Sequence, residues 1–241
     1  MQTIAIMGLK GGVGKTTAAI NIASELAADG QRVLLLELSK QGNIGRFFGA
    51  SKTDGMAAVL TGAKMADVIE HTEHEGLDMV ASDMSILTAE PGALTLKKAL
   101  DGIDKDYDFA VIDCEPTFDA ATVTAIMAAD KIYTPLRPDQ YSIDAAKELF
   151  SQIARVDNGK IGGAFVNIIS NSKADREALE AIKTQMEIVP VIIHKSAIVE
   201  RMSWASQPVN ILSPRSKAAK EYGDLTDWIV SDLWLLSDSD N

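Results

Sequence analysis

The chain has 241 residues, of which 46% are hydrophobic and 24% charged, and we expect residues 1–241 to form one globular domain. Its single cysteine, Cys114, excludes an intrachain disulfide and a four-cysteine metal site within one chain. The net charge of −11 argues against a surface that coats nucleic acid, and without an apolar run of 18 residues we expect a cytoplasmic protein.

Short apolar runs alternate with segments of helical periodicity along the chain. The apolar runs cover residues 3–8, 32–38, 77–82, 109–114, 131–136 and 162–170. Helices are predicted at 15–30, 92–104, 117–129, 142–156, 174–186 and 215–236. Strands this apolar are typical of a sheet covered on both faces, with helices as the crossovers. The sequence therefore predicts an α/β fold with a doubly wound, mostly parallel sheet and helices on both faces.

A glycine-rich turn joins the run at 3–8 to a helix that opens at Thr16 and Thr17. Its sequence, LKGGVGK, has leucine at position 9, where the common phosphate-loop pattern G-x-x-x-x-G-K-[ST] has glycine. We expect Lys15 to reach the β- and γ-phosphates of ATP and the Thr16 hydroxyl to bind Mg²⁺. Backbone amides would surround the phosphates, and these belong to Gly11, Gly12, Val13 and Gly14.

A carboxylate ends the apolar run FAVID. Asp113 would therefore lie at the carboxyl edge of a central strand, where α/β sheets collect their ligands. We expect it to hold a water of the Mg²⁺ shell. The alternative is an aspartate that caps the helix beginning near Thr117.

The stretch KGGVGKTT at 10–17 resembles the deviant Walker A motif of the ParA/MinD family of ATPases, and most of all that of ParA-like partition proteins. The resemblance extends along nearly the whole chain, through QGN, FAVIDC, TPLRPDQYSIDAAKELF and SPRSKAAKEYGDL. It implies a sandwich homodimer that forms with ATP, in which Lys10 of each subunit crosses to the other subunit's phosphates. It also implies that Asn167 or Asn171 reads adenine, and the alternative is an ordinary loop asparagine.

The first switch departs from the family. Where the family usually reads D-x-D-P-Q-G-N, this chain reads ELSKQGN. Glu37 keeps the first acid, for which we expect a catalytic role, but Ser39 replaces the aspartate that orients the attacking water. Serine carries no charge and accepts a proton poorly, so hydrolysis is expected to be slow or to use another acid. Glu115, where the family commonly has proline, is the candidate for that acid.

Basic residues gather between residues 190 and 222, where five of them against two glutamates leave a net charge of +3. The resemblance implies that this region binds DNA without sequence preference in the ATP-bound dimer and that a ParB-like or other partner stimulates release. Such a protein would lie on the nucleoid. The alternative is an ordinary solvated helix face. The candidate DNA-binding residues are Lys195, Arg201, Arg215, Lys217 and Lys220.

Two other functions remain open. A MinD-like positioning regulator would need a C-terminal amphipathic helix with a basic polar face, but the polar residues of 224–241 are mainly aspartate and serine. We therefore expect no membrane partner and a terminal helix that packs in the core. A metabolic P-loop enzyme would need a small-molecule pocket, and turnover that requires a small carboxylic acid would favour it.

Overall fold

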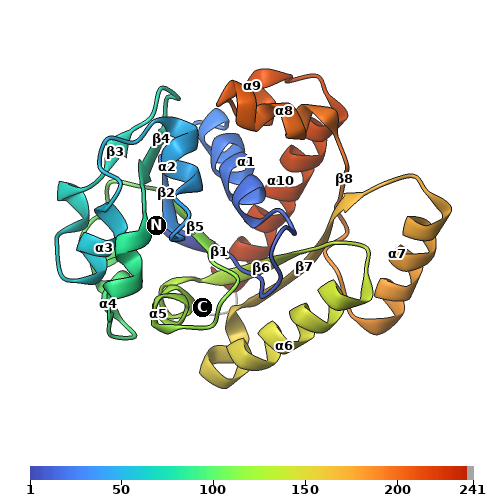
Figure 1. Cartoon of the computed structure of the whole chain (residues 1–241), viewed down its shortest axis with the longest axis horizontal. Coiled ribbons are helices and arrows are strands. Elements are labelled where there is room, and N and C mark those ends of the chain that lie inside the picture. Colours follow the sequence, from blue (N-terminus) through green and yellow to red (C-terminus); the bar gives the residue numbers. More distant parts are fainter. Residues whose placement is uncertain (238–241) are drawn as a thin grey trace.

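A computed structural model describes residues 1–237, and the side chains of Asn158 and of residues 235–237 lie outside that description. Eight strands form one sheet in the order β3-β4-β2-β5-β1-β6-β7-β8 (Figure 1). Their bounds are β1 Gln2–Ile6, β2 Val33–Leu38, β3 Glu70–His71, β4 Leu77–Val80, β5 Phe109–Cys114, β6 Lys131–Leu136, β7 Ile161–Ile169 and β8 Ile192–His194.

The predicted parallel sheet is confirmed. All pairings are parallel except the one between β3 and β4, where a two-residue strand runs antiparallel at the edge. Every residue of β2, β5 and β6 is buried, because helices cover both faces of these strands. The six predicted strands all form, and the short strands β3 and β8 are additions.

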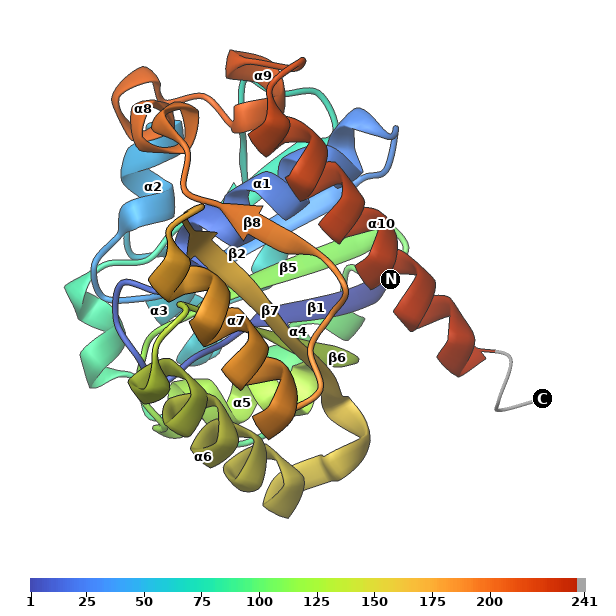
Figure 2. The ribbon, with the colours of Figure 1, turned by 90° about the vertical axis from the view of Figure 1, so that its right-hand side faces the viewer.

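Helices lie on both faces of the sheet, as Figures 1 and 2 show. One face is covered by α1, α2, α9 and α10, with α1 packed directly against α10. The other face is covered by α3, α4, α5 and α6. The bounds are α1 Lys15–Ala28, α2 Asn43–Phe48, α3 Gly55–Leu60, α4 Thr95–Asp101, α5 Ala120–Ala128, α6 Gln140–Asp157, α7 Lys173–Gln185, α8 Ala197–Ala205, α9 Val209–Leu212 and α10 Lys217–Ser237. Single 3₁₀ turns lie at Met65–Asp67, Met84–Thr88 and Asn158–Lys160.

The C-terminal helix packs in the core, as predicted. Tyr222, Leu225, Ile229 and Leu233 of α10 are buried at 1% exposure or less and join the same apolar cluster as α1. Among the described residues, no helix is long and apolar enough to span a bilayer. The apolar stripe of α10 is therefore used by the fold itself.

Candidate nucleotide-binding site

The phosphate loop lies between the carboxyl end of β1 and the start of α1. Gly12 and Gly14 adopt positive φ angles of 71° and 92°. A Cβ on Gly14 would lie 2.4 Å from Nδ2 of Asn167, so only glycine fits this position. A cavity of about 250 Å³ opens above the loop. The loop residues that line it are Gly11, Gly12, Gly14, Lys15, Thr16 and Thr17, whereas the Val13 side chain is buried at 2% exposure.

Lys15 and Asp113 face this cavity together. Burial lowers the pKa of Lys15, and the nearby Asp113 carboxylate opposes that shift. The Nζ of Lys15 donates to the backbone carbonyl of Lys10 at 3.3 Å. The ammonium of Lys15 therefore bonds to its own loop and also lines the cavity, where a bound phosphate could contact it.

The Asp113 and Thr16 pair fits a hydrated Mg²⁺ ion. The Thr16 hydroxyl donates to Oδ2 of Asp113 at 2.6 Å, while Oδ1 is buried without a hydrogen-bond partner among the described residues. Burial raises the pKa of Asp113 to about 7, and Glu37 and Glu115 add to the rise that Thr16 and Lys15 oppose. A divalent cation would compensate this buried oxygen and hold the carboxylate in its charged form.

Glu37 lies beneath the first switch and does not line the phosphate cavity. Its carboxylate accepts hydrogen bonds from the amides of Ile44 at 3.0 Å and Gly45 at 3.1 Å, at the start of α2. Burial raises its pKa despite these amides, which lower it. In this geometry Glu37 holds the start of α2, and its charge raises the pKa of Asp113. Its catalytic role stays a prediction.

The second half of the first switch reaches the cavity. Ser39, Gln41 and Asn43 line it opposite the phosphate loop. Gly42 adopts a φ of 61°, and a Cβ there would lie 2.8 Å from the carbonyl oxygen of Ser82. The glycine of the QGN sequence is thus required by the close approach of two backbone segments.

Lys10 points away from the phosphate cavity. Its Nζ bonds to both carboxylate oxygens of Asp139, at 2.7 and 2.8 Å, and to the Ser142 hydroxyl at 3.1 Å. It is not among the residues that line the phosphate cavity. Sequence reasoning missed this partner, although an aspartate three residues before Ser142 at a helix start is a recognisable capping pattern.

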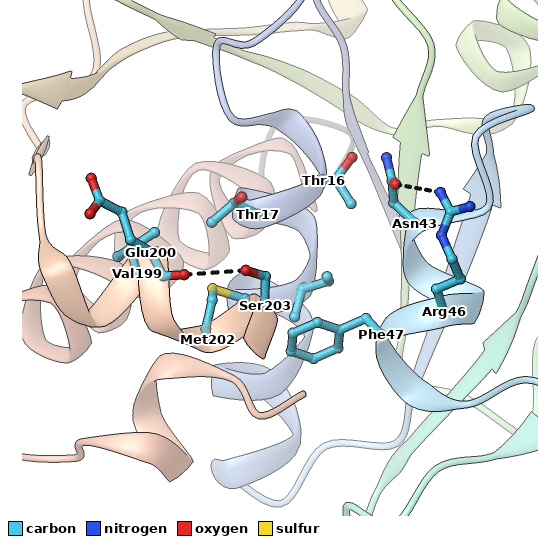
Figure 3. A pocket seen from close by; sticks show the side chains of 10 residues that line it. Thr16, Thr17, Asn43, Arg46, Phe47, Val199, Glu200, Met202 and Ser203 are labelled. Carbon is cyan, nitrogen blue, oxygen red and sulfur yellow. Dashed lines mark hydrogen bonds between the residues drawn. The ribbon is translucent and has the colours of Figure 1, made fainter. Parts of the chain in front are cut away.

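Two further cavities flank Thr17 and adjoin the phosphate cavity. One, of about 240 Å³, is lined by Asn167, Ile168 and the segment after β8. The other, of about 410 Å³, lies between α1, α2 and α8, with Phe47 and Met202 on its apolar wall (Figure 3). A nucleotide whose phosphates bind the loop can extend its base from here into either space.

Of the two candidate asparagines, Asn167 lines one of these cavities and Asn171 lines none of the three. Its Nδ2 donates to the Val13 carbonyl at 2.8 Å, so it also supports the phosphate loop. Asn171 lies in the turn before α7, where its carbonyl accepts from Arg176, and it lines neither flanking cavity. Ile168 has a φ of 59°, a strained value for a β-branched residue. This turn of the backbone lets Ile168 and Asn167 line the same cavity.

Comparison with known proteins agrees with this geometry. The family model for an AAA domain matches residues 1–161. The chain belongs to the ParA/MinD family of P-loop ATPases. It is 27% identical to the sporulation initiation inhibitor protein Soj of Bacillus subtilis, over 95% of this chain and 98% of that protein. It is 36% identical to the chromosome partitioning protein ParA of Caulobacter vibrioides, over 65% of this chain and 63% of that protein.

The fold of this ParA-family ATPase also matches a solved structure. The septum site-determining protein MinD of Pyrococcus horikoshii, solved with Mg-ADP, superposes with a TM-score of 0.81. The match covers 93% of this chain and 94% of that one at 22% identity, so it supports the fold. The sequence predictions of family, fold class and ATPase activity are confirmed.

The candidate DNA-binding residues of this ATPase lie around α8 and the start of α10. Lys195 pairs with Glu200 at 3.7 Å, and Lys217 pairs with Glu221 at 3.3 Å. These two charges are partly neutralised. The other three candidates, Arg201, Arg215 and Lys220, have exposed side chains.

Proposed function

We propose that this ATPase binds ATP with Mg²⁺ and then forms a sandwich homodimer that binds DNA without sequence preference. The dimer would act in the partition of a plasmid or chromosome, or in the positioning of another cargo. A ParB-like or other partner would stimulate its release. The Caulobacter vibrioides relative is a chromosome partitioning protein, which supports this process.

The observation that carries the proposal is the orientation of Lys10. This lysine sits on the phosphate loop, yet its ammonium contacts Asp139 and Ser142 and leaves its own cavity to Lys15. A second lysine on the loop that does not face its own phosphate cavity could reach the nucleotide of a facing subunit once it leaves Asp139. Such a contact would make dimerisation depend on ATP, because the phosphates supply the opposite charge.

Slow hydrolysis is part of the proposal. Ser39 lines the phosphate cavity and is 7% exposed. In the sequence it takes the position at which the family usually has an aspartate. A neutral hydroxyl polarises water less than a carboxylate does. We expect the ATP-bound dimer to be longer-lived than that of a relative with aspartate at this position.

Dimerisation is tested by size-exclusion chromatography with light scattering, with and without ATP and Mg²⁺. We expect wild type to double its mass with ATP and Lys10→Ala to remain monomeric. Lys183→Ala is the matched control, because it removes an exposed lysine on α7. A wild type that stays monomeric with ATP, or a Lys10→Ala variant that dimerises as wild type does, would refute the proposal.

DNA binding is tested by fluorescence anisotropy of a random duplex with a non-hydrolysable ATP analogue at low salt. Charge reversal of Arg215 and Lys220 should abolish binding, and the same reversal of Lys147 and Lys183 should not. The logarithm of the wild-type affinity should fall linearly with the logarithm of salt, by about 0.9 for each phosphate contact. If both charge-reversal variants bound the duplex equally well, the surface around Arg215 and Lys220 would be excluded as the DNA-binding site.

A further inference from the structure

Glu115, which lines the phosphate cavity, is bonded to Ser39 and Lys40, where the first switch has neither the aspartate nor the proline of its family. Its Oε1 accepts from the Lys40 amide at 2.9 Å and from the Ser39 hydroxyl at 3.3 Å. Its Oε2 lies 3.4 Å from the Lys40 ammonium, and the Glu115 side chain is only 10% exposed. The segment that follows β5 therefore supplies a nearly buried carboxylate beside the serine that replaces an aspartate.

This carboxylate faces the same space as the phosphate-binding groups. Glu115 lines the cavity together with Lys15, Thr16 and Asp113. Its charge adds to the rise in the pKa of Asp113 and opposes the fall that burial causes in the pKa of Lys15. The acid is thus close to the groups that would hold the phosphates and the metal ion.

The other carboxylates near the cavity have different partners. Asp113 accepts from Thr16 through one oxygen, and its second oxygen suits the metal shell. Glu37 accepts from backbone amides of α2 and does not line the cavity. Within the part of the chain that the structure describes, Glu115 is the remaining acid at this cavity. A carboxylate has about four acceptor positions, so Oε2 retains one for a water.

We propose that Glu115 orients and deprotonates the attacking water in this ATPase, and that the Ser39 hydroxyl and the Lys40 backbone amide hold Glu115 in position. The water oxygen forms a bond to the γ-phosphorus, while the bond from that phosphorus to the β–γ bridging oxygen breaks and its electron pair leaves with ADP. Glu115 takes the water proton and returns it to solvent. ATP and water thereby give ADP, hydrogen phosphate and one proton. The inference rests on the proposed ATPase cycle.

Lys40 limits this carboxylate. Its ammonium and its amide bind the two oxygens that the water would use. The Glu115 carboxylate is therefore shared between Lys40 and the water, which agrees with slow hydrolysis. Removal of the ammonium in Lys40→Ala should speed the step, because Oε2 then no longer shares its acceptor positions with a cation.

The test is a single-turnover assay with full-length protein in excess over ATP and Mg²⁺. Glu115→Gln keeps the size and an acceptor for the Lys40 amide, and should slow hydrolysis by about 100-fold or more, as loss of a general base does. Affinity for a fluorescent non-hydrolysable ATP analogue should change less than about threefold, since a water-orienting group stabilises the transition state. Glu180→Gln, at an exposed glutamate of α7, is the matched control.

A second variant separates chemistry from structure. Ser39→Asp restores an acid on the first switch and should return the Glu115→Gln protein to within about tenfold of the wild-type rate, a gain typical of a regained base. Glu115→Gln hydrolysing within twofold of wild type would overturn the inference. The inference would also be overturned if Glu115→Gln slowed hydrolysis only because it no longer bound the analogue, and if Ser39→Asp did not restore the rate. The single-turnover rate is measured per bound nucleotide, so it is a separate readout from dimerisation and DNA binding. Failure in those two assays would refute the proposed function and not the role of Glu115.

Discussion

Removal of the charge on Asp139 should make dimerisation easier. In the structure the Lys10 ammonium is held by this carboxylate, and it must leave before it can reach a facing subunit. The two side chains are 30% and 35% exposed, so solvent screens the pair, and it contributes about 0.5–1 kcal/mol. Two such pairs break per dimer, about 1–2 kcal/mol in total, which corresponds to a dissociation constant roughly 5- to 30-fold lower in the variant.

Asp139→Asn is the sharper substitution, because asparagine can still accept the Ser142 amide that caps α6 at 2.9 Å. The control is Asp157→Asn, at the far end of the same helix, where the aspartate accepts the Gly159 amide. Sedimentation equilibrium with a non-hydrolysable ATP analogue gives the dissociation constants. An Asp139→Asn dimer no tighter than wild type would show that releasing Lys10 costs nothing, and would refute this reasoning.

Three further predictions concern the loop, the switch and the metal site. Asn167→Ala loses the bond to the Val13 carbonyl and should lower the free energy of unfolding by about 1–2 kcal/mol and weaken ADP binding, as measured by urea unfolding and calorimetry. Gly42→Ala should cost about 1–3 kcal/mol, because of its positive φ and the nearby Ser82 carbonyl, and an unchanged free energy of unfolding would contradict this close approach. The pKa of Asp113 is about 7 in the folded chain and about 4 in the unfolded chain, so without Mg²⁺ its contribution to stability falls as the pH rises from about 4 to 7. Asp113→Asn should remove that part of the pH dependence, measured by urea unfolding at pH 5 and 8.

The phosphate loop and the central strands could be predicted because their information is local. A buried parallel strand needs a continuous apolar run, and the loop needs glycines beside a lysine and a hydroxyl. The helix α2 was not predicted, because its six residues include a glycine and two phenylalanines, which are modest helix formers. Its start is held by the Glu37 carboxylate, and that contact depends on the folded sheet.

Contacts between distant side chains were beyond sequence reasoning. Lys10 and Asp139 lie 129 positions apart, with five strands between them, so their meeting follows from the strand order. The same holds for Ser39 and Glu115, which directly follow the neighbouring strands β2 and β5. The sequence suggested Glu115 as an acid near the phosphates, but only the pairing of these strands brings it to the serine.

Lys10 and Lys40 are each held by a carboxylate that the phosphates of ATP could displace. Lys10 is held by Asp139 and Lys40 by Glu115, so each ammonium has a local carboxylate in this structure. The phosphates of ATP carry more charge than either carboxylate and would compete for both ammonium groups. Transfer of Lys10 to a nucleotide would favour the dimer, and transfer of Lys40 would release Glu115 for the water. Nucleotide binding would thus assemble the dimer and unmask its acid through the same exchange of ion pairs, and a Lys40→Ala protein should hydrolyse faster without dimerising more tightly.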